Sequence, residues 1–200
     1  MTGAMVATAA RLLAATKVRW EGCEPSARQR VYFANHRSHL DFVIVWSVLP
    51  RQLRESTRPV GARDYWGHGR LRKLMATRVF DVLLIDRAPV PGNPDSMGLM
   101  LDVLDGGTSL ILFPEGSRGS AEEPARFRSG LYNLALQRPA VELVPVRLDN
   151  LGRVLPKGEL IPLPLPTMVT FRPPICVEPG EGREAFLVRA RAAVMPEQPA

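Results

Sequence analysis

Short apolar runs alternate with segments of helical periodicity along this chain, and that alternation limits the possible folds more than any other feature. The apolar runs are Val31–Ala34, Pro59–Ala62, Val82–Ile85, Ser109–Phe113, Leu143–Leu148 and Met168–Phe171. Helices are predicted near residues 38–49, 67–76, 95–105, 128–137 and 183–194. Because the runs are apolar on both faces, the predicted strands belong to a sheet covered on both sides. The 200 residues therefore predict a single α/β domain with a mostly parallel central sheet flanked by helices.

The composition limits the partners and the compartment. A formal net charge of +6 favours an anionic partner. Charge alone does not separate nucleic acid from an anionic membrane or a phosphorylated metabolite. Cys23 and Cys176 are far apart and offer neither a metal-binding spacing nor a disulfide framework, so a reducing compartment is expected.

The N-terminal segment is expected to form a helix over residues 1–17. It is too short to span a bilayer, which needs roughly 18 or more apolar residues, and Arg11 interrupts it. Two interpretations remain open, an interfacial helix on a membrane and a helix packed on the domain. Residues 18–195 are expected to form the globular domain, and residues 196–200 a flexible tail.

Three polar clusters follow directly after predicted strands. Residues 35–41 (NHRSHLD) follow the first apolar run, Asp86 and Arg87 follow the third, and residues 114–118 (PEGSR) follow the fourth. Ligands of parallel sheets bind at the carboxyl ends of the strands. The three clusters are therefore expected to face one another across a single cleft.

The first cluster has a catalytic and a structural interpretation. His36 is a candidate general base, with Asp41 accepting a hydrogen bond from its other ring nitrogen. Alternatively, Ser38 and Asp41 form a capping box at the start of a helix. A metal site on His36, His39 and Asp41 is a third possibility, but His68 is the only other histidine and ligands are few. No serine or cysteine stands in the nucleophile pattern G-x-S-x-G, so the substrate is expected to supply the reacting hydroxyl.

The other clusters contain the parts of a phosphate-binding site. A glycine permits close backbone approach, a hydroxyl donates a hydrogen bond, and arginine binds phosphate through two parallel hydrogen bonds. A further arginine stands at the start of a predicted helix, where the dipole also favours anions. The candidate substrate-binding residues are Arg87, Glu115, Gly116, Ser117, Arg118 and Arg128.

Together these motifs resemble the glycerophospholipid acyltransferase family, whose best-known type is 1-acyl-sn-glycerol-3-phosphate acyltransferase. The likeness runs from about Val31 to Ile175. The family pattern N-H-x-S-x-x-D matches residues 35–41, I-D-R matches 85–87, F-P-E-G-T/S-R matches 113–118, F-K/R-x-G matches 127–130, and V-P-V matches 144–146. The residue that opens the second motif is Asp81, where the family usually has glycine.

The resemblance implies a fold like that of the glycerol-3-phosphate acyltransferases, and it also implies a function. Residues 18–195 would be an acyltransferase domain that moves a fatty acyl group from acyl-CoA or acyl carrier protein to the free hydroxyl of 1-acyl-sn-glycerol-3-phosphate, giving phosphatidic acid. His36 would be the base and Asp41 its orienting partner, while Arg87, Glu115, Arg118 and Arg128 would hold the acceptor. His39 would be a bystander.

The resemblance also implies the setting of the reaction. No metal or other cofactor and no nucleic acid would take part, and the protein would lie in the cytoplasm, peripherally on the inner face of the cell membrane. Two alternatives keep the same motifs. The acceptor is another lysolipid or lipid-like molecule, or the protein is a non-catalytic module that binds lipid or CoA.

Overall fold

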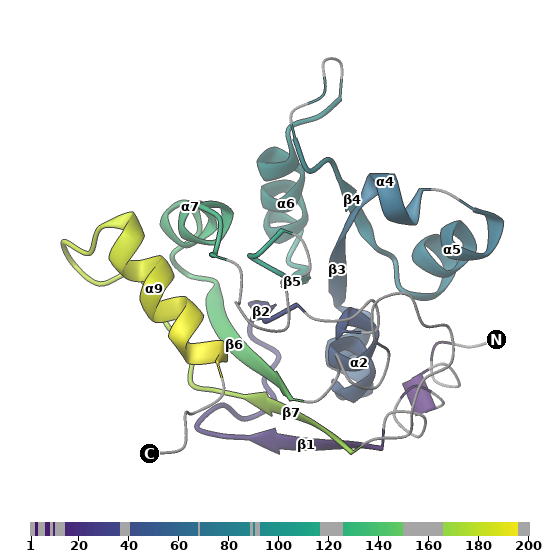
Figure 1. The fold of residues 1–200 in the computed structure, drawn as a ribbon, viewed down its shortest axis with the longest axis horizontal. Helices are drawn as coiled ribbons and strands as arrows, with labels where there is room; N and C mark the ends of the chain where they lie inside the picture. Colours follow the sequence, from purple (N-terminus) through teal and green to yellow (C-terminus); the bar gives the residue numbers. More distant parts are fainter. Residues whose placement is uncertain are drawn as a thin grey trace.

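A computed structural model gives the arrangement of most of the chain. It describes residues 3, 7, 8, 10, 15–36, 41–67, 69–88, 90, 93–116, 126–149 and 166–195. The described residues form a central sheet with helices on both faces (Figure 1). The predicted α/β class is therefore confirmed.

The sheet has seven strands and is mostly parallel. The strands are β1 (Thr16–Trp20), β2 (Arg30–Ala34), β3 (Thr57–Ala62), β4 (Leu83–Ile85), β5 (Ser109–Leu112), β6 (Glu142–Asp149) and β7 (Thr167–Phe171). Their order in the sheet is β1-β7-β6-β2-β5-β3-β4. Strands β2 to β6 run parallel, β7 is antiparallel to β6, and β1 is parallel to β7.

The helices cover the two faces of the sheet. The helical segments are α2 (Asp41–Val48), α3 (Arg51–Glu55), α4 (Arg63–Trp66), α5 (Arg70–Leu74), the π-helix η1 (Met75–Val79), α6 (Ser96–Asp105), α7 (Gly130–Gln137) and α9 (Arg183–Val194). Buried residues of α2 form one core with η1 and one face of the sheet. Those of α6, α7 and α9 form a second core on the other face.

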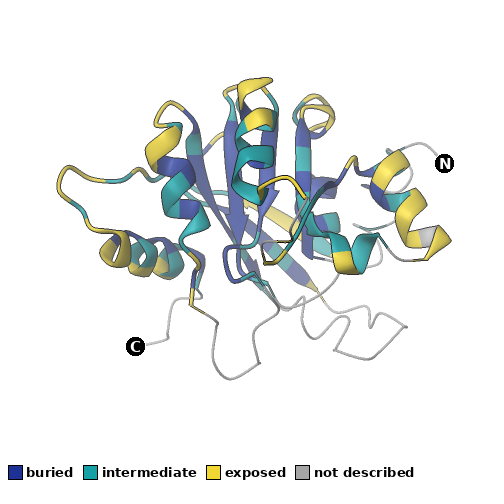
Figure 2. Cartoon of the chain, turned by 90° about the horizontal axis from the view of Figure 1, so that it is seen from above, coloured by how far each residue is buried: buried dark blue, intermediate teal, exposed yellow. Residues whose placement is uncertain are grey.

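Strand β2 shows why the apolar runs predicted the sheet. All five of its residues are buried. Tyr32 and Ala34 join the core beside α2, whereas Val31 and Phe33 join the core beside α6 and α7. Successive side chains of a strand point to opposite faces, so a strand covered on both sides is apolar at consecutive positions. Figure 2 shows the resulting buried strands between helices whose outer surfaces are exposed.

Both ends of helix α6 carry residues that are typical of helix termini. The Asp95 side chain accepts a hydrogen bond from the backbone N–H of Gly98 at 3.0 Å, which caps the helix. Gly107, just after the helix, has φ of +78°, a conformation that favours glycine. Local turn chemistry therefore sets both ends of this helix.

Three short elements were not predicted. These are β1, α3 and α4, of which the helices have five and four residues. β1 lies at the sheet edge and exposes its central residues, so it lacks the continuous apolar pattern of the inner strands. It also begins at Thr16, inside the segment expected to be helical over residues 1–17. Ser38 of the expected capping box and the tail at 196–200 lie outside the described residues.

None of the helices within the described ranges combines the length and apolar character needed to cross a membrane.

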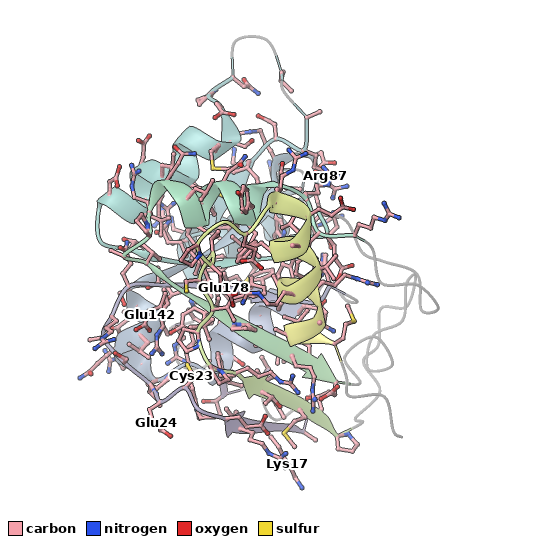
Figure 3. All side chains as sticks on the ribbon, turned by 90° about the vertical axis from the view of Figure 1, so that its left-hand side faces the viewer. Lys17, Cys23, Glu24, Arg87, Glu142 and Glu178 are labelled. Atoms are coloured by element: carbon pink, nitrogen blue, oxygen red, sulfur yellow. The ribbon has the colours of Figure 1, made fainter. Side chains whose placement is uncertain are left out.

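The sheet carries charged groups at the ends of its strands. Glu142, which begins β6, accepts hydrogen bonds from Arg28 at 2.9 Å and Arg30 at 2.8 Å. Burial raises the pKa of the Glu142 carboxyl, but these hydrogen bonds outweigh burial and lower it. In Figure 3, Glu142 and Arg87 are labelled on opposite sides of the molecule, since Arg87 follows the carboxyl end of β4.

Asp81 stands where the family that the motifs resemble usually has glycine, and its backbone is left-handed, with φ of +49°. This conformation costs most residues roughly 1–2 kcal/mol, although aspartate adopts it more readily than most. Arg58 compensates by donating hydrogen bonds to the Asp81 backbone carbonyl at 2.9 Å and to its carboxylate at 3.2 Å. The strand β4 is thus entered through a glycine-like turn without glycine.

Candidate functional site

A cleft of about 540 Å³ lies at the carboxyl ends of β2, β3, β4 and β5. Its acidic, basic and imidazole lining side chains are those of His36, Asp86, Arg87, Asp95 and Arg128. Its apolar lining includes Val60, Ile85, Met97, Met100, Leu112, Leu131 and Leu134. The cleft therefore joins a polar region at the strand ends to an apolar region reaching α6 and α7. This is the place where the polar clusters were predicted to meet.

His36 follows β2, and Asp41 is the first residue of α2. His36 Nδ1 lies 2.8 Å from Asp41 Oδ2, a hydrogen-bonding distance. The Asp41 side chain is fully buried, whereas the His36 side chain is 21% exposed and lines the cleft. A carboxylate at Nδ1 favours the tautomer with the proton on that nitrogen, which leaves the Nε2 lone pair available as a base. The predicted contact between the two residues is therefore present.

Asn35 fixes the end of β2 next to His36. Its amide nitrogen donates to the Leu148 carbonyl at 3.0 Å, and its amide oxygen accepts from the Leu148 N–H at 2.9 Å. The side chain thus forms the same pair of bonds as a neighbouring strand residue would form with β6. Sequence reasoning assigned no role to Asn35, although its position directly before His36 in the motif was a signal.

Phe113 and Glu115, which follow β5, both contact His36. The His36 backbone N–H donates to Glu115 Oε1 at 3.0 Å, and the His36 ring stacks on Phe113 with centroids 4.4 Å apart. Glu115 is buried and is not among the residues that line the cleft. The sequence suggested that Glu115 binds the acceptor, but the structure places its carboxylate under the backbone of the histidine.

Gly116 permits the close approach of Arg128. Its φ is +72°, and a Cβ at this position would lie 2.5 Å from Arg128 Nε. The Arg128 N–H also donates to the Pro114 carbonyl at 2.8 Å. Both Gly116 and Arg128 line the cleft, so the two segments matched to separate motifs form one surface.

Arg87 also lines the cleft. Its Nε is 3.4 Å from the Asp64 carboxylate of α4. The neighbouring Asp86 is instead paired with Arg63, at 3.3 Å, and its side chain also accepts from Asn93 at 2.9 Å. Two ion pairs therefore cross between α4 and the turn after β4. The sequence did not predict the pairing of Arg87 with Asp64, because α4 was not predicted.

Ser117 and Arg118, the remaining candidate substrate-binding residues, lie outside the described residues, as does His39. Among the residues that the structure does describe, no group of three or more metal-ligating side chains is found. The described part of the site therefore consists of a histidine–carboxylate pair, two arginines and an apolar region.

Helix α4 adds an aromatic wall that the sequence did not predict. Tyr65 and Trp66 line the cleft, and the Phe42 ring packs edge-on against Trp66 with centroids 5.0 Å apart. Gly61 in β3 allows this packing, since a Cβ there would lie 2.9 Å from the Trp66 ring. The absence of a side chain at this position thus keeps the aromatic wall close to the sheet.

Comparisons with known proteins agree with this geometry. The sequence model of the acyltransferase family matches residues 17–149. A 1-acyl-sn-glycerol-3-phosphate acyltransferase of Limnanthes douglasii is 28% identical over 159 residues, which is 79% of this chain and 54% of that protein. The chloroplastic 1-acyl-sn-glycerol-3-phosphate acyltransferase LPAT1 of Arabidopsis thaliana is 26% identical over 145 residues, covering 71% of this chain and 38% of that protein.

A solved structure shares the fold. The 1-acyl-sn-glycerophosphate acyltransferase PlsC of Thermotoga maritima superposes with a TM-score of 0.74 at 18% identity, covering 96% of this chain and 75% of that one. The chain spans about half or less of the length of these two plant relatives. The region matched by the acyltransferase family model, residues 17–149, nevertheless contains every described residue of the candidate site.

Proposed function

We propose that this chain, which belongs to the acyltransferase family, transfers a fatty acyl group from a thioester donor to the free hydroxyl of 1-acyl-sn-glycerol-3-phosphate. The product is phosphatidic acid, an intermediate of phospholipid biosynthesis. The observation that carries the proposal is the contact between His36 Nδ1 and the buried Asp41 carboxylate in a cleft that also contains Arg87 and Arg128. The names of the relatives support the choice of acceptor.

In the proposed reaction, His36 acts as the general base. Its Nε2 accepts the proton of the acceptor hydroxyl while the hydroxyl oxygen attacks the thioester carbonyl carbon. A C–O bond forms and the C–S bond breaks, and the imidazolium returns the proton to the departing thiolate. Asp41 stabilises the imidazolium, and general base assistance of this kind contributes about 10²–10⁴-fold. The reaction needs no metal or other cofactor beyond the acyl-CoA or acyl carrier protein that donates the acyl group.

The remaining groups position the two substrates. Arg87 and Arg128, together with Arg118, bind the acceptor phosphate, because arginine matches phosphate geometry with paired hydrogen bonds. Gly116 and Ser117 complete this site, and Glu115 acts through the His36 backbone. The apolar part of the cleft is suited to a hydrocarbon chain, since burial of each CH₂ contributes about 0.8 kcal/mol.

The acceptor is a membrane lipid, so we place the protein in the cytoplasm with peripheral contact to the inner face of the cell membrane. The excess of positive charge favours an anionic lipid surface. No nucleic acid takes part in the proposed reaction.

A second acceptor class is favoured by one observation. Two carboxylates accompany Arg87, since Asp64 lies 3.4 Å from it and Asp86, the residue before it, lines the cleft. A lysolipid whose headgroup carries a primary ammonium or hydroxyl group beside its phosphate would hydrogen-bond to both carboxylates and arginines. Such an acceptor would show as donor turnover that does not respond to lysophosphatidic acid.

Release of free CoA from acyl-CoA, with and without lysophosphatidic acid, tests the function. We expect release that depends on the acceptor and is abolished in His36→Ala, with phosphatidic acid as the product. Normal turnover by His36→Ala would overturn the mechanism. Release without acceptor would indicate a hydrolase, and tight ligand binding without turnover would indicate a non-catalytic binding module.

A further inference from the structure

Helices α5 and η1 form a continuous arm, residues 70–79, that we call the basic arm. It projects at the edge of the molecule beyond α4 (Figure 1), and its surface is mainly exposed (Figure 2). Only its base is held in the core, where Ala76 is fully buried. Phe80, directly after the arm, packs edge-on against Trp46 with centroids 5.0 Å apart. The arm is therefore anchored at one end and open to solvent along the rest.

The arm carries four exposed cations, Arg70, Arg72, Lys73 and Arg78. The sequence contains no acidic residue between Asp64 and Asp81. None of the four cations forms an ion pair with another residue of the described ranges. Several arginines elsewhere on the surface, such as Arg138, are paired with carboxylates. The arm is thus a local concentration of uncompensated positive charge.

An exposed leucine lies among these cations. Leu74 is 54% exposed, and Lys73 and Arg78 flank it along the arm. Apolar side chains among basic ones are typical of segments that lie in the interface of a membrane, where cations meet anionic headgroups and the apolar group enters the acyl boundary.

The arm is joined to the mouth of the cleft. The Arg72 guanidinium lies 4.8 Å from the ring centroid of Tyr65, which lines the cleft beside Trp66. A surface bound by the arm therefore lies next to an opening into the proposed acceptor site.

We propose that the basic arm is the surface through which this protein docks on an anionic lipid bilayer. The inference rests on the proposed membrane contact and assigns it to particular residues. Charge complementarity selects the headgroups, and Leu74 selects a bilayer over an acidic protein, because an apolar side chain surrounded by cations is suited to insertion between anionic lipids. Docking in this orientation shortens the path of a lysolipid from the bilayer to the cleft.

Sedimentation with lipid vesicles tests the assignment without any reaction. The wild-type protein is expected to bind vesicles of phosphatidylcholine and phosphatidylglycerol in equal parts, and to bind pure phosphatidylcholine vesicles weakly. Each cation near an anionic surface contributes about fivefold to partitioning, so Arg70→Glu/Lys73→Glu/Arg78→Glu should bind about 100-fold less or weaker still. Leu74→Ser should reduce binding by about tenfold, and added salt should weaken wild-type binding.

The matched control is Lys17→Glu/Arg19→Glu/Arg183→Glu, which changes the net charge by the same amount. Lys17 and Arg19 lie on β1, at the opposite edge of the sheet from β4, and Figure 3 shows Lys17 far from Arg87. This control should retain vesicle binding. An equal loss in the control would show that net charge alone governs binding and would overturn the proposal, as would unchanged binding by the arm variant.

Two further measurements separate this proposal from the proposed reaction. His36→Ala should bind vesicles as the wild type does, whereas the arm variant should retain transfer from acyl-CoA to a short-chain, water-soluble lysophosphatidic acid. If the wild type binds vesicles but transfers no acyl group, only the proposed function fails. If the arm variant binds vesicles normally but loses transfer from acyl carrier protein alone, the arm is a protein-docking surface and the lipid assignment is wrong.

Discussion

Replacement of Asp41 by asparagine tests the proposed chemistry most directly. Asp41 Oδ2 lies 2.8 Å from His36 Nδ1, and the Asp41 side chain is fully buried. The substitution preserves the size of the side chain and removes its negative charge. The asparagine amide also donates to Nδ1, which moves the proton of a neutral imidazole to Nε2. The nitrogen that would accept the substrate proton then has no lone pair.

The expected loss of kcat follows from the distance between the charges. When the imidazolium forms, its charge centre lies about 4 Å from that of the carboxylate, and two unit charges so placed interact by about 4 kcal/mol at an effective dielectric constant of about 20. Because about 1.36 kcal/mol corresponds to a tenfold change in rate, loss of this attraction lowers kcat by about 10³-fold. The KM for the acceptor should remain unchanged, since Asp41 does not line the cleft.

Initial rates of CoA release, measured over a range of acceptor concentrations, separate the two constants. Asp102→Asn is the matched control, because Asp102 is an exposed carboxylate on α6 outside the cleft. Near-ultraviolet circular dichroism establishes that both variants retain their packing. A folded Asp41→Asn variant with a kcat within about tenfold of the wild-type value would refute the reasoning.

Three further changes have defined outcomes. Gly116→Ala should lower the free energy of unfolding, measured in urea, by about 1–2 kcal/mol because the φ of residue 116 is +72°. It should also raise the KM for the acceptor, because the new Cβ displaces Arg128. An unchanged KM would contradict a phosphate-binding role for that arginine. Asn35→Ala should lower the free energy of unfolding by about 1–3 kcal/mol, since the N–H and carbonyl of Leu148 in β6 lose their hydrogen bonds to the Asn35 side chain. The same change should lower kcat more than it changes KM. Equal unfolding midpoints for the variant and the wild type would contradict the anchoring role. For Glu142, burial raises the pKa but arginine hydrogen bonds lower it overall, so its stabilising effect is present above its ordinary value of 4.5 and lost as the pH falls through the lower, folded-state pKa. When the pH is lowered from neutral to acidic, the free energy of unfolding in urea should therefore fall less for Glu142→Gln than for the wild type, with Asp102→Asn as control. An equal fall in Glu142→Gln would exclude a contribution from the hydrogen bonds between Glu142 and its arginines.

The predictability of the fold differed between inner and outer elements. The inner strands, such as β2 and β5, are apolar at consecutive positions because both faces are covered, and that pattern is visible without any structure. Helix α6 carries its own cap and its terminal glycine. By contrast, β1 and α4 depend on neighbours distant in sequence, which no local pattern encodes.

The candidate site shows the same division. His36 and Asp41 lie five positions apart at the start of one helix, so their contact was one of the interpretations that the sequence left open. The contact between Gly116 and Arg128 depends on how the chain returns after β5, and the pairing of Arg87 with Asp64 depends on α4. These contacts join residues that lie 12 and 23 positions apart (128 − 116 and 87 − 64), so only the tertiary structure reveals them.

The pairing of β1 with β7 has a consequence for synthesis of the chain. Thr16 and Thr167, which face each other across this pair, are separated by 151 positions in sequence. At about 5–20 residues per second, β1 waits roughly 8–30 s after its own synthesis before its partner exists. Its exposed positions carry Lys17 and Arg19, and charged side chains on an unpaired strand oppose association with other chains. Strand β1 is thus made well before the strand with which it pairs, and its two cations protect it in the interval.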